Sequence, residues 1–423
     1  MSDFDTLGLK PVLLAALKEA GLTSPTPIQH KAIPLAMAGN DVMGLAQTGT
    51  GKTMAFGIPL VSHLLDMPDR PAAKTAKSLI LAPTRELVNQ IAEALRTLTK
   101  KTHLKVNVVV GGQSINKQIH HLLKGTDILV ATPGRLIDLM DRKAVDLRTV
   151  KHLVLDEADQ MLDMGFIHAL RRIAPKLGTP RQTMLFSATM PKQMEDLSKA
   201  YLTNPQRVQV APPGKAADKI TQSVHHLASK GAKPGKLREI LSRDATALTL
   251  VFSRTKHGAE KLMKGLVADG YNAASIHGNK SQGQRDRAIK AFREGQITVL
   301  VATDVAARGI DIPGVAYVVN YDLPDVPDNY VHRIGRTARA GREGEAIAFC
   351  APDEADLLRQ IEKLMKIEVP VASGEAPKDP VARPAQQSRG RGRGGQGANK
   401  PRQANAGGKP GGQRRRSRSR KAA

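Results

Sequence analysis

Short apolar segments alternate with longer stretches of mixed polarity along most of the chain. In the first half, the segments that indicate buried strands are 78–82, 106–110, 128–131, 152–155 and 183–187. Strands separated by helix-length segments predict a parallel α/β sheet covered on both faces. Because ligands bind at the carboxyl ends of such strands, polar motifs that directly follow these segments are candidate site residues.

A second alternation of the same kind follows. Its predicted strands are 248–252, 272–276, 298–302, 315–319 and 345–349. Prolines and glycine interrupt the pattern around 204–219, which predicts a boundary there. We therefore predict an α/β protein with a first domain at 1–207, a linker at 208–218, a second domain at 219–368 and a tail at 369–423.

The strongest single motif is a glycine-rich loop between the apolar run that starts at Val42 and a predicted helix. The loop consists of Ala46, Gln47, Thr48, Gly49, Thr50, Gly51, Lys52 and Thr53. Glycines let backbone N–H groups point at a phosphate, the lysine reaches the outer phosphates and the last threonine offers a hydroxyl to Mg²⁺. The loop predicts binding of a nucleoside triphosphate, although Ala46 stands where the usual pattern has glycine.

An acidic segment follows the strand that ends at Leu155. Asp156 is placed to hold Mg²⁺, and Glu157 to orient or deprotonate the water that attacks the γ-phosphate. An acidic helix cap is the alternative, and the phosphate loop upstream favours the metal site. The hydroxyls of Ser187 and Thr189, at the end of the next strand, are expected to bridge this segment to the rest of the site.

Three further loops of the first domain combine small residues with a hydroxyl or arginine: 83–87, 111–112 and 132–135. Such groups hold a sugar–phosphate backbone without reading bases, so together they predict a groove for a nucleic-acid strand. Upstream, the carboxamide of Gln29 matches the adenine edge that carries N6 and N7.

The second domain lacks a Gly-Lys-Thr loop but carries 303–311 and a cationic run at 332–339. His332, Arg333, Arg336 and Arg339 fall within eight residues. A solvated face or a polyanion contact is the ordinary interpretation. Beside a nucleotide held by the first domain, the sharper one is a set of arginine fingers at the γ-phosphate.

Composition narrows the partner class. The net charge is +25, and residues 371–423 carry +12 of it with 14 Lys and Arg against 2 acidic residues. A basic body with a more basic tail favours nucleic acid over an anionic membrane. The tail contains no aromatic residue and has Arg-Gly repeats, so we expect it to be disordered and to tether RNA, with a merely solubilising tail as the alternative.

The cysteine content and the lack of long apolar segments indicate the cellular compartment. The lone cysteine, Cys350, lies in an apolar run and is expected to be a buried core residue. The sequence shows neither a signal region nor a long apolar span, so we expect a cytoplasmic protein with no membrane partner.

In their order and spacing these motifs resemble those of the DEAD-box RNA helicases, over about residues 4–368. Asp156-Glu-Ala-Asp159 spells the family name, and Ala46 is what the family normally has there. The basic tail on a short core is similar to the bacterial RhlE-type subgroup. The resemblance implies two tandem RecA-like domains with a cleft between them, ATP and Mg²⁺ as cofactors, and RNA as partner.

The resemblance also implies residue roles. Phe4 and Gln29 would recognise adenine, and Asp311 the ribose. Lys52, Thr53, Asp156 and Glu157 take the phosphate, Mg²⁺ and water roles given above. Ser187 and Thr189 would couple hydrolysis to strand separation, with Arg336 and Arg339 as fingers and His332 in the linking network. The expected RNA-groove residues are Arg85, Gly112, Thr132, Arg135, Arg254, His277, Gly278, Thr303 and Arg308.

Two positions depart from the family pattern. Leu22 stands where many members carry an aromatic residue, so the adenine pocket would be less stacked. Ala338 replaces a glycine between the last two arginines, which costs little unless the position needs positive φ.

The expected function is ATP-dependent, local and non-processive unwinding of RNA duplexes and remodelling of RNA–protein particles, in ribosome assembly or RNA decay. Ribosomal precursors and RNA-decay enzymes are candidate partners. Two alternatives stay open: a DNA-directed helicase or translocase, and an RNA-annealing chaperone that acts mainly through the tail.

Overall fold

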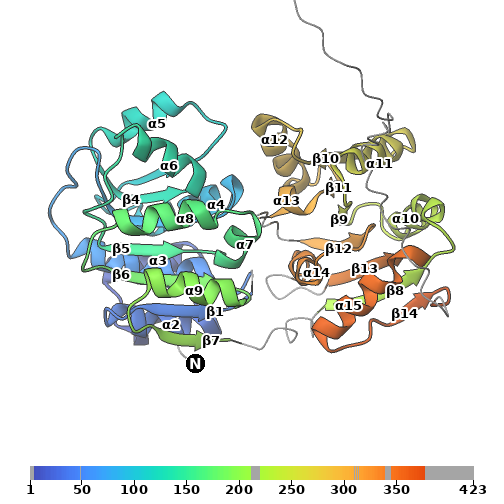
Figure 1. Ribbon diagram of the computed structural model, residues 1–423, viewed down its shortest axis with the longest axis horizontal. Helices are drawn as coiled ribbons and strands as arrows, with labels where there is room; N and C mark the ends of the chain where they lie inside the picture. The colour runs from blue at the N-terminus through green and yellow to red at the C-terminus, as the bar shows by residue number, and fades with distance from the viewer. Residues whose placement is uncertain are drawn as a thin grey trace, which may run out of the picture. The chain divides into compact units, whose positions relative to one another are not determined.

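Two parallel sheets, each covered by helices, form the body of the computed structural model (Figure 1). The structure describes residues 4–47, 49–210, 220–308, 310, 312, 314–338 and 344–376. Most of the predicted tail therefore lies outside the described residues.

The first sheet has the strand order β3-β4-β2-β5-β6-β1-β7, with every pair parallel. A 3₁₀ turn at Phe4–Leu7 precedes it. Its elements are, in chain order, α1 (Pro11–Glu19), α2 (Pro27–Met37), β1 (Val42–Leu45), α3 (Lys52–Leu65), β2 (Ala76–Leu81), α4 (Arg85–Thr99), β3 (Val106–Val109), α5 (Ile115–Leu122), β4 (Thr126–Ala131), α6 (Pro133–Asp141), β5 (His152–Leu155), α7 (Ala158–Asp163), α8 (Ile167–Ile173), β6 (Gln182–Ser187), α9 (Lys192–Tyr201) and β7 (Gln206–Gln209).

The second sheet has the order β10-β11-β9-β12-β13-β8-β14 and is also parallel in every pair. Its elements are β8 (Ile220–His226), α10 (Lys233–Leu241), β9 (Leu248–Phe252), α11 (Lys256–Ala268), β10 (Ala273–Ile276), α12 (Gln282–Arg293), β11 (Val299–Ala302), α13 (Asp304–Ala307), β12 (Val315–Asn320), α14 (Pro327–Ile334), β13 (Gly344–Cys350), α15 (Ala355–Met365) and β14 (Val371–Ser373).

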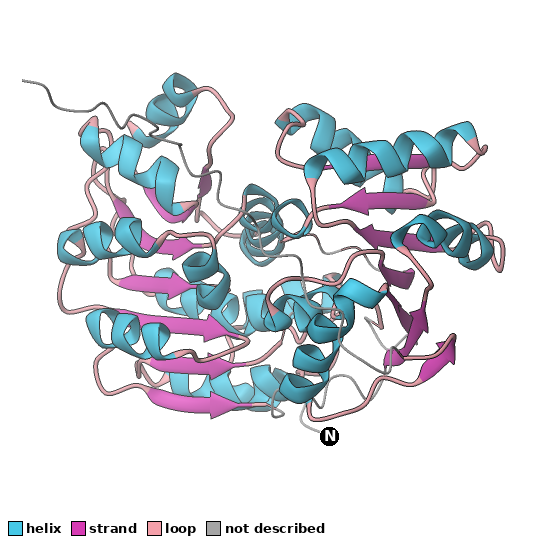
Figure 2. Cartoon of the chain, turned by 45° about the vertical axis from the view of Figure 1, so that its right-hand side comes forward, coloured by secondary structure: helices cyan, strands magenta, loops and turns pink. Residues whose placement is uncertain are grey.

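The alternation of side chains along each strand builds two cores in the first domain. On β2, Ile80 joins the cluster that contains α3 and α4, whereas Leu79 and Leu81 join the cluster that contains α6 and α8. Figure 2 shows the strands of this sheet running the same way between their helices. Because both faces are covered, the central strands are mostly apolar, which is why the sequence pattern predicted them well.

The two parallel sheets confirm the predicted α/β class, but the edges of each sheet differ from the prediction. The strands β7, β8 and β14 were not predicted, because β7 (Gln-Arg-Val-Gln) and β8 mix polar with apolar residues. β7 extends the first sheet to Gln209, past the predicted boundary at 207. Val369 is buried and Val371 pairs with Val224, so strand pairing continues past residue 369, where the tail was predicted to start. The predicted domain bounds stay predictions.

Cys350 is 1 % exposed at the end of β13, which confirms the prediction of a core residue. Burial raises the pKa of its thiol to about 12, so the thiol is unreactive at neutral pH. Among the described residues, none of the helices combines the length and the apolar character needed to cross a bilayer.

Buried His152 and half-buried His63 are expected to make the stability of the first domain depend on pH. The rings of His63 and His152 stack at 5.2 Å, and burial, followed by the charge of His63, lowers the pKa of His152 from 6.5 to about 4. The unfolded chain then takes up this proton more readily than the folded one. We expect the free energy of unfolding to fall by about 3 kcal/mol as the pH drops from about 6.5 to about 4.

Urea denaturation across this pH range, followed by circular dichroism, measures the effect. The variant His152→Gln, which places a non-titrating side-chain amide beside Gln182, should lose most of the slope. An unchanged slope in the variant would place the pH dependence on other groups.

Candidate nucleotide and nucleic-acid site

The phosphate loop joins β1 to α3, and its backbone requires glycine at two positions. Gly49 and Gly51 have φ of 81° and 90°, in the region that L side chains rarely adopt. A Cβ on Gly51 would lie 2.4 Å from Gln29 Nε2. The open turn leaves Lys52 as the first residue of α3, at the positive end of the helix. Thr48 lies outside the described residues.

Gln29 fixes the start of α2 against this loop. Its Nε2 donates to the Gly51 carbonyl oxygen at 3.0 Å, and its Oε1 accepts from the Thr26 amide at 2.9 Å. Both carboxamide atoms therefore have protein partners, so an adenine contact would share or replace these bonds. Phe4 is 4 % exposed and packs into the core beside α1, while Leu22 packs against the same core.

Lys52, Asp156 and Glu157 form a buried charged group under the loop. Lys52 Nζ lies 3.8 Å from Glu157 Oε1, and both side chains are 6 % exposed. Burial is the main reason that the pKa of Asp156 rises to about 7. The positive charge of Lys52 lowers this pKa, and the negative charge of Glu157 raises it further. Lys52 Nζ and Glu157 Oε2 are buried without a hydrogen-bond partner among the described residues. Such orphaned polar atoms fit a site built for a polar ligand.

Glu157 also has a strained backbone, with φ 50° and ψ 51°. Non-glycine residues in this region cost about 1–3 kcal/mol and cluster at functional sites. This conformation places the Glu157 carboxylate beside Lys52. Glu157 is also the residue that directly precedes α7.

The metal candidates follow two strands that are separated only by β6 in the sheet. Thr53 lies in the first turn of α3 after β1, and Asp156 lies between β5 and α7. The described residues hold no group of three or more His, Cys, Asp or Glu suited to a metal. Mg²⁺ beside phosphates needs only one or two protein oxygens, because phosphate and water supply the others. The donor set therefore fits Mg²⁺.

Asp159 connects the acidic segment to the end of β6, a role that the sequence analysis did not assign to it. Its Oδ2 accepts from the amides of Ala188 and Thr189 at 3.0 and 2.8 Å and from the Thr189 hydroxyl at 3.1 Å. Ser187 instead donates its hydroxyl to the Thr189 carbonyl oxygen at 2.7 Å. The position of Asp159, three residues after Asp156 in the same acidic segment, was the sequence signal that could have identified this role.

The nucleic-acid candidates of the first domain lie after β2, β3 and β4, which are neighbours in the sheet. Arg85 packs on Gly112, whose added Cβ would lie 2.1 Å from Arg85 Nη1. Arg135 Nη1 donates to the Gln113 carbonyl oxygen at 3.0 Å, and Thr132 is the residue before α6. The structure thus brings Arg85, Gly112, Thr132 and Arg135 to one edge of the sheet, the edge that also carries the phosphate loop.

The candidates of the second domain follow β9, β10 and β11, again neighbouring strands. Arg254 Nη2 donates to Glu354 Oε1 and to the Leu323 carbonyl oxygen, both at 3.0 Å. His277 Nε2 lies 3.0 Å from Glu260 Oε2. Hydrogen bonds from Ser275, then His277 and Lys280, lower the pKa of Glu260 to about 2.

The other three candidates of this domain lie at the same edge. Gly278 follows His277 directly, and Thr303 precedes α13. Arg308 donates to Asn329 Oδ1 at 3.1 Å.

The cationic run divides into residues with different surroundings. Arg333 is 2 % exposed and binds both Asp304 oxygens, at 2.5 and 2.8 Å, and also Asn320 and the Asp322 carbonyl oxygen. Arg336 is 5 % exposed and donates to the Ile310 carbonyl oxygen at 2.8 Å. His332 is half-buried. Asp311 and Arg339 lie outside the described residues, so their predicted contacts stay predictions.

Ala338 meets the condition under which its methyl group is costly, because its φ is 53°. We expect Ala338→Gly to raise the free energy of unfolding of the second domain by about 0.5–1 kcal/mol, since glycine adopts this φ without steric conflict. Thermal unfolding followed by calorimetry measures the change. Ala288→Gly, which makes the same change inside α12 where the backbone is helical, is the control and should lower the free energy of unfolding. A fall in both variants would refute the strain at Ala338.

Comparisons with known proteins agree with this geometry. The sequence profile of the DEAD/DEAH box helicases matches residues 26–197, and that of the helicase conserved C-terminal domain matches 232–341. The chain is 43 % identical to the RNA helicase CrhR of Synechocystis over 372 residues, 88 % of this chain and 74 % of that protein. It is 42 % identical to the DEAD-box ATP-dependent RNA helicase CshA of Bacillus subtilis over 363 residues, 86 % of this chain and 72 % of that protein.

A solved structure shares the fold. S. cerevisiae Dbp5 bound to RNA and ADP BeF3 superposes with a TM-score of 0.79 at 34 % identity, covering 88 % of this chain and 95 % of that one.

Proposed function

Because this chain belongs to the DEAD-box family of ATP-dependent RNA helicases, with the tandem RecA-like domains of that family, we propose how its residues divide the work. ATP bound at the phosphate loop drives local, non-processive opening of RNA duplexes and remodelling of RNA–protein particles. The observation that carries this proposal is the buried Lys52–Glu157 pair, whose unpartnered atoms lie at the sheet edge that also presents the nucleic-acid candidates.

In this proposal each residue of the first domain acts on a part of the nucleotide. Lys52 binds the outer phosphates, and the loop amides from Ala46 to Thr53 surround them. Glu157 orients the attacking water and accepts its proton. Thr53 and Asp156 would hold Mg²⁺, which neutralises charge on the phosphate oxygens when bound. Phe4 and Gln29 contact the base.

The second domain supplies cations to the γ-phosphate. Arg336 and Arg339 act as arginine fingers, His332 belongs to the network that links the sites, and Asp311 contacts the ribose. Arg336 then exchanges the Ile310 carbonyl oxygen for a phosphate oxygen, so its release is part of domain closure. Asp159 transmits the state of the nucleotide to Ser187 and Thr189 through its three hydrogen bonds.

RNA is held through its backbone by Arg85, Gly112, Thr132 and Arg135 and by the second-domain set described above. Contacts to phosphates and 2′-hydroxyls favour RNA over DNA and give little sequence preference. Ribosome assembly and RNA decay are the processes that we propose. The RhlE-type assignment stays a prediction based on the basic tail, since the relatives described above are named CshA and CrhR.

The steady-state ATPase rate without nucleic acid, with single-stranded RNA and with DNA of the same sequence tests this proposal. The full chain is compared with a chain that ends at residue 376, after β14. Strong stimulation by RNA alone that survives shortening is the expected result. Equal stimulation by DNA would favour the DNA-directed alternative, and stimulation lost with the tail would favour the chaperone alternative.

A further inference from the structure

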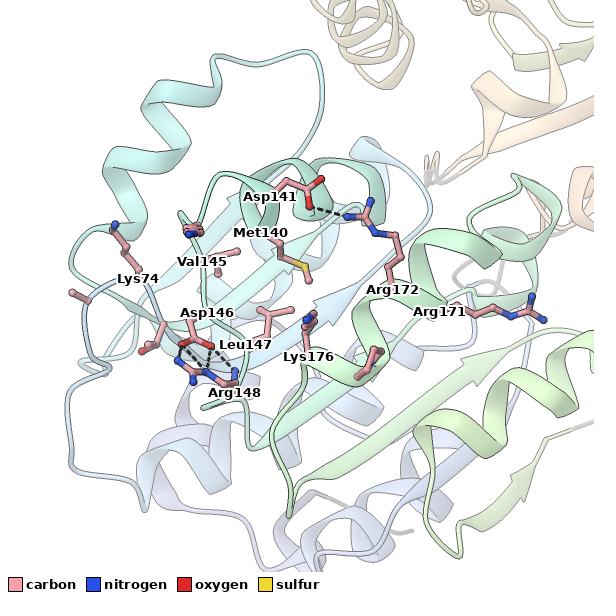
Figure 3. Close-up of a pocket in the computed structure, with 14 residues that line it drawn as sticks. Lys74, Met140, Asp141, Val145, Asp146, Leu147, Arg148, Arg171, Arg172 and Lys176 are labelled. Atoms are coloured by element: carbon pink, nitrogen blue, oxygen red, sulfur yellow. Dashed lines mark hydrogen bonds and ion pairs between the residues drawn. The ribbon is translucent and has the colours of Figure 1, made fainter.

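A basic concavity of about 1100 Å³ lies in the first domain, away from the phosphate loop (Figure 3). Its walls come from the turn before β2, the segment between α6 and β5, and the end of α8 with the turn that follows. These segments lie at the amino ends of the strands. The phosphate loop and the nucleic-acid candidates lie at the opposite, carboxyl edge, so this concavity is a separate site.

The concavity carries more positive charge than its own carboxylates balance. Asp146 pairs with Arg148 at 2.6 Å, and Asp141 with Arg172 at 2.7 Å. Its remaining cations are all exposed and have no carboxylate within ion-pair distance in the described part of the chain. They are Lys74, Lys143, Arg171 and Lys176. Figure 3 shows the Arg171 guanidinium pointing away from the hollow, so the three lysines are the unbalanced cations that surround it. Three unbalanced cations around one hollow favour a ligand with several negative charges.

The backbone holds two of these lysines in a fixed and unfavourable conformation. Lys74 and Lys143 have φ of 61° and 52°, where glycine or asparagine is usual. The Lys74 amide donates to the Leu122 carbonyl oxygen at 3.0 Å, and its carbonyl oxygen accepts from Asp146 at 2.7 Å. The rim is therefore anchored, and lysine occupies positions where its backbone is strained by about 1 kcal/mol.

Helix ends explain only part of this charge. Lys143 and Arg171 lie at the C-terminal ends of α6 and α8, where cations offset the helix dipole. Lys74 belongs to no helix, yet it faces the same hollow. The convergence of loop and helix cations indicates a shared ligand.

We propose that this concavity binds the sugar–phosphate backbone of RNA outside the catalytic groove. Among the described residues, the lining contains no aromatic side chain on which a base could stack. Of its larger apolar side chains, Val145 and Leu147 are buried and Met140 is half-buried. What the surface offers is repeated charge on long, flexible stems, which suits phosphates repeated along a strand. A second contact of this kind would retain a long RNA while the catalytic groove releases and rebinds it.

The test compares two triple variants of the full chain with the same change in charge. Lys74→Glu/Lys143→Glu/Lys176→Glu reverses the concavity. Lys18→Glu/Arg96→Glu/Lys199→Glu reverses exposed cations of the same domain that lie outside it. Fluorescence anisotropy across a salt series measures binding of a short single strand and of a duplex several turns long.

We expect the concavity variant to bind the long duplex about tenfold more weakly than the control variant. Its slope of log affinity against log salt should be smaller in magnitude by about 2, because binding through fewer phosphate contacts releases fewer counterions from the RNA. Binding of the short strand, and the ATPase rate that it stimulates, should match the control. Thiouridine-containing long RNA should cross-link to residues 143–148 or 171–176.

Three outcomes would overturn the proposal. Equal weakening in both variants would show a general effect of net charge. Unchanged RNA binding with lost binding of polyglutamate would assign the concavity to an acidic protein partner. Unchanged RNA binding with a lower unfolding temperature would assign the lysines to helix-end stabilisation alone.

Discussion

Replacing Glu157 by Gln is expected to lower the RNA-stimulated rate of ATP hydrolysis by about 10²–10⁴-fold, the usual contribution of a positioned general base. Glutamine keeps the volume of the buried side chain but cannot accept the proton of the attacking water. ATP binding should persist, because Lys52 and the loop amides remain. Steady-state hydrolysis and the affinity for a fluorescent ATP analogue separate the two effects.

Glu195→Gln makes the same chemical change on the exposed side of α9 and should leave the rate unchanged. If Glu157→Gln hydrolyses ATP at the normal rate, Glu157 is not the base. If it loses ATP binding as well, the Lys52–Glu157 pair acts chiefly in building the site.

Replacing Arg333 by Ala is expected to lower the free energy of unfolding of the second domain by about 3–5 kcal/mol. Arg333 is fully buried, and its loss leaves Asp304, Asn320 and the Asp322 carbonyl oxygen without their shared donor. It also removes the guanidinium that lies 4.9 Å from the centre of the Phe252 ring. Urea denaturation of the full chain measures the change.

Arg359→Ala is the matched control, because Arg359 also pairs with an aspartate, Asp356, but on the exposed surface of α15. Exposed pairs contribute about 0–1 kcal/mol, so this variant should stay close to the unsubstituted protein. Similar losses in both variants would show that burial is not what makes the Arg333 pair important. A stable Arg333→Ala that loses only ATPase activity would return Arg333 to the group of catalytic candidates.

The sequence determined the parts of this protein that depend on local chemistry. The glycines of the phosphate loop, the Gly-Lys-Thr ending and the acidic segment after β5 are each contiguous, so residue types alone indicated phosphate and metal chemistry. The central strands are apolar on both faces, so their pattern was equally direct. The sequence also indicated that alanine at position 338 is unfavourable if the backbone there has positive φ, and Ala338 has φ of 53°.

Only the tertiary structure decided which of several similar side chains faces a ligand and which faces the core. In the run from His332 to Arg339, the sequence shows equivalent cations, but packing buries Arg333 against Asp304, 29 residues earlier. The bonds from Asp159 to Thr189, and the basic concavity around Lys74, Lys143 and Lys176, likewise join residues far apart in the chain. The edge strands β7 and β14 were not predicted, also because they depend on tertiary contacts. Their pairing depends on a neighbouring strand rather than on their own hydrophobicity, and sequence pattern records only the latter.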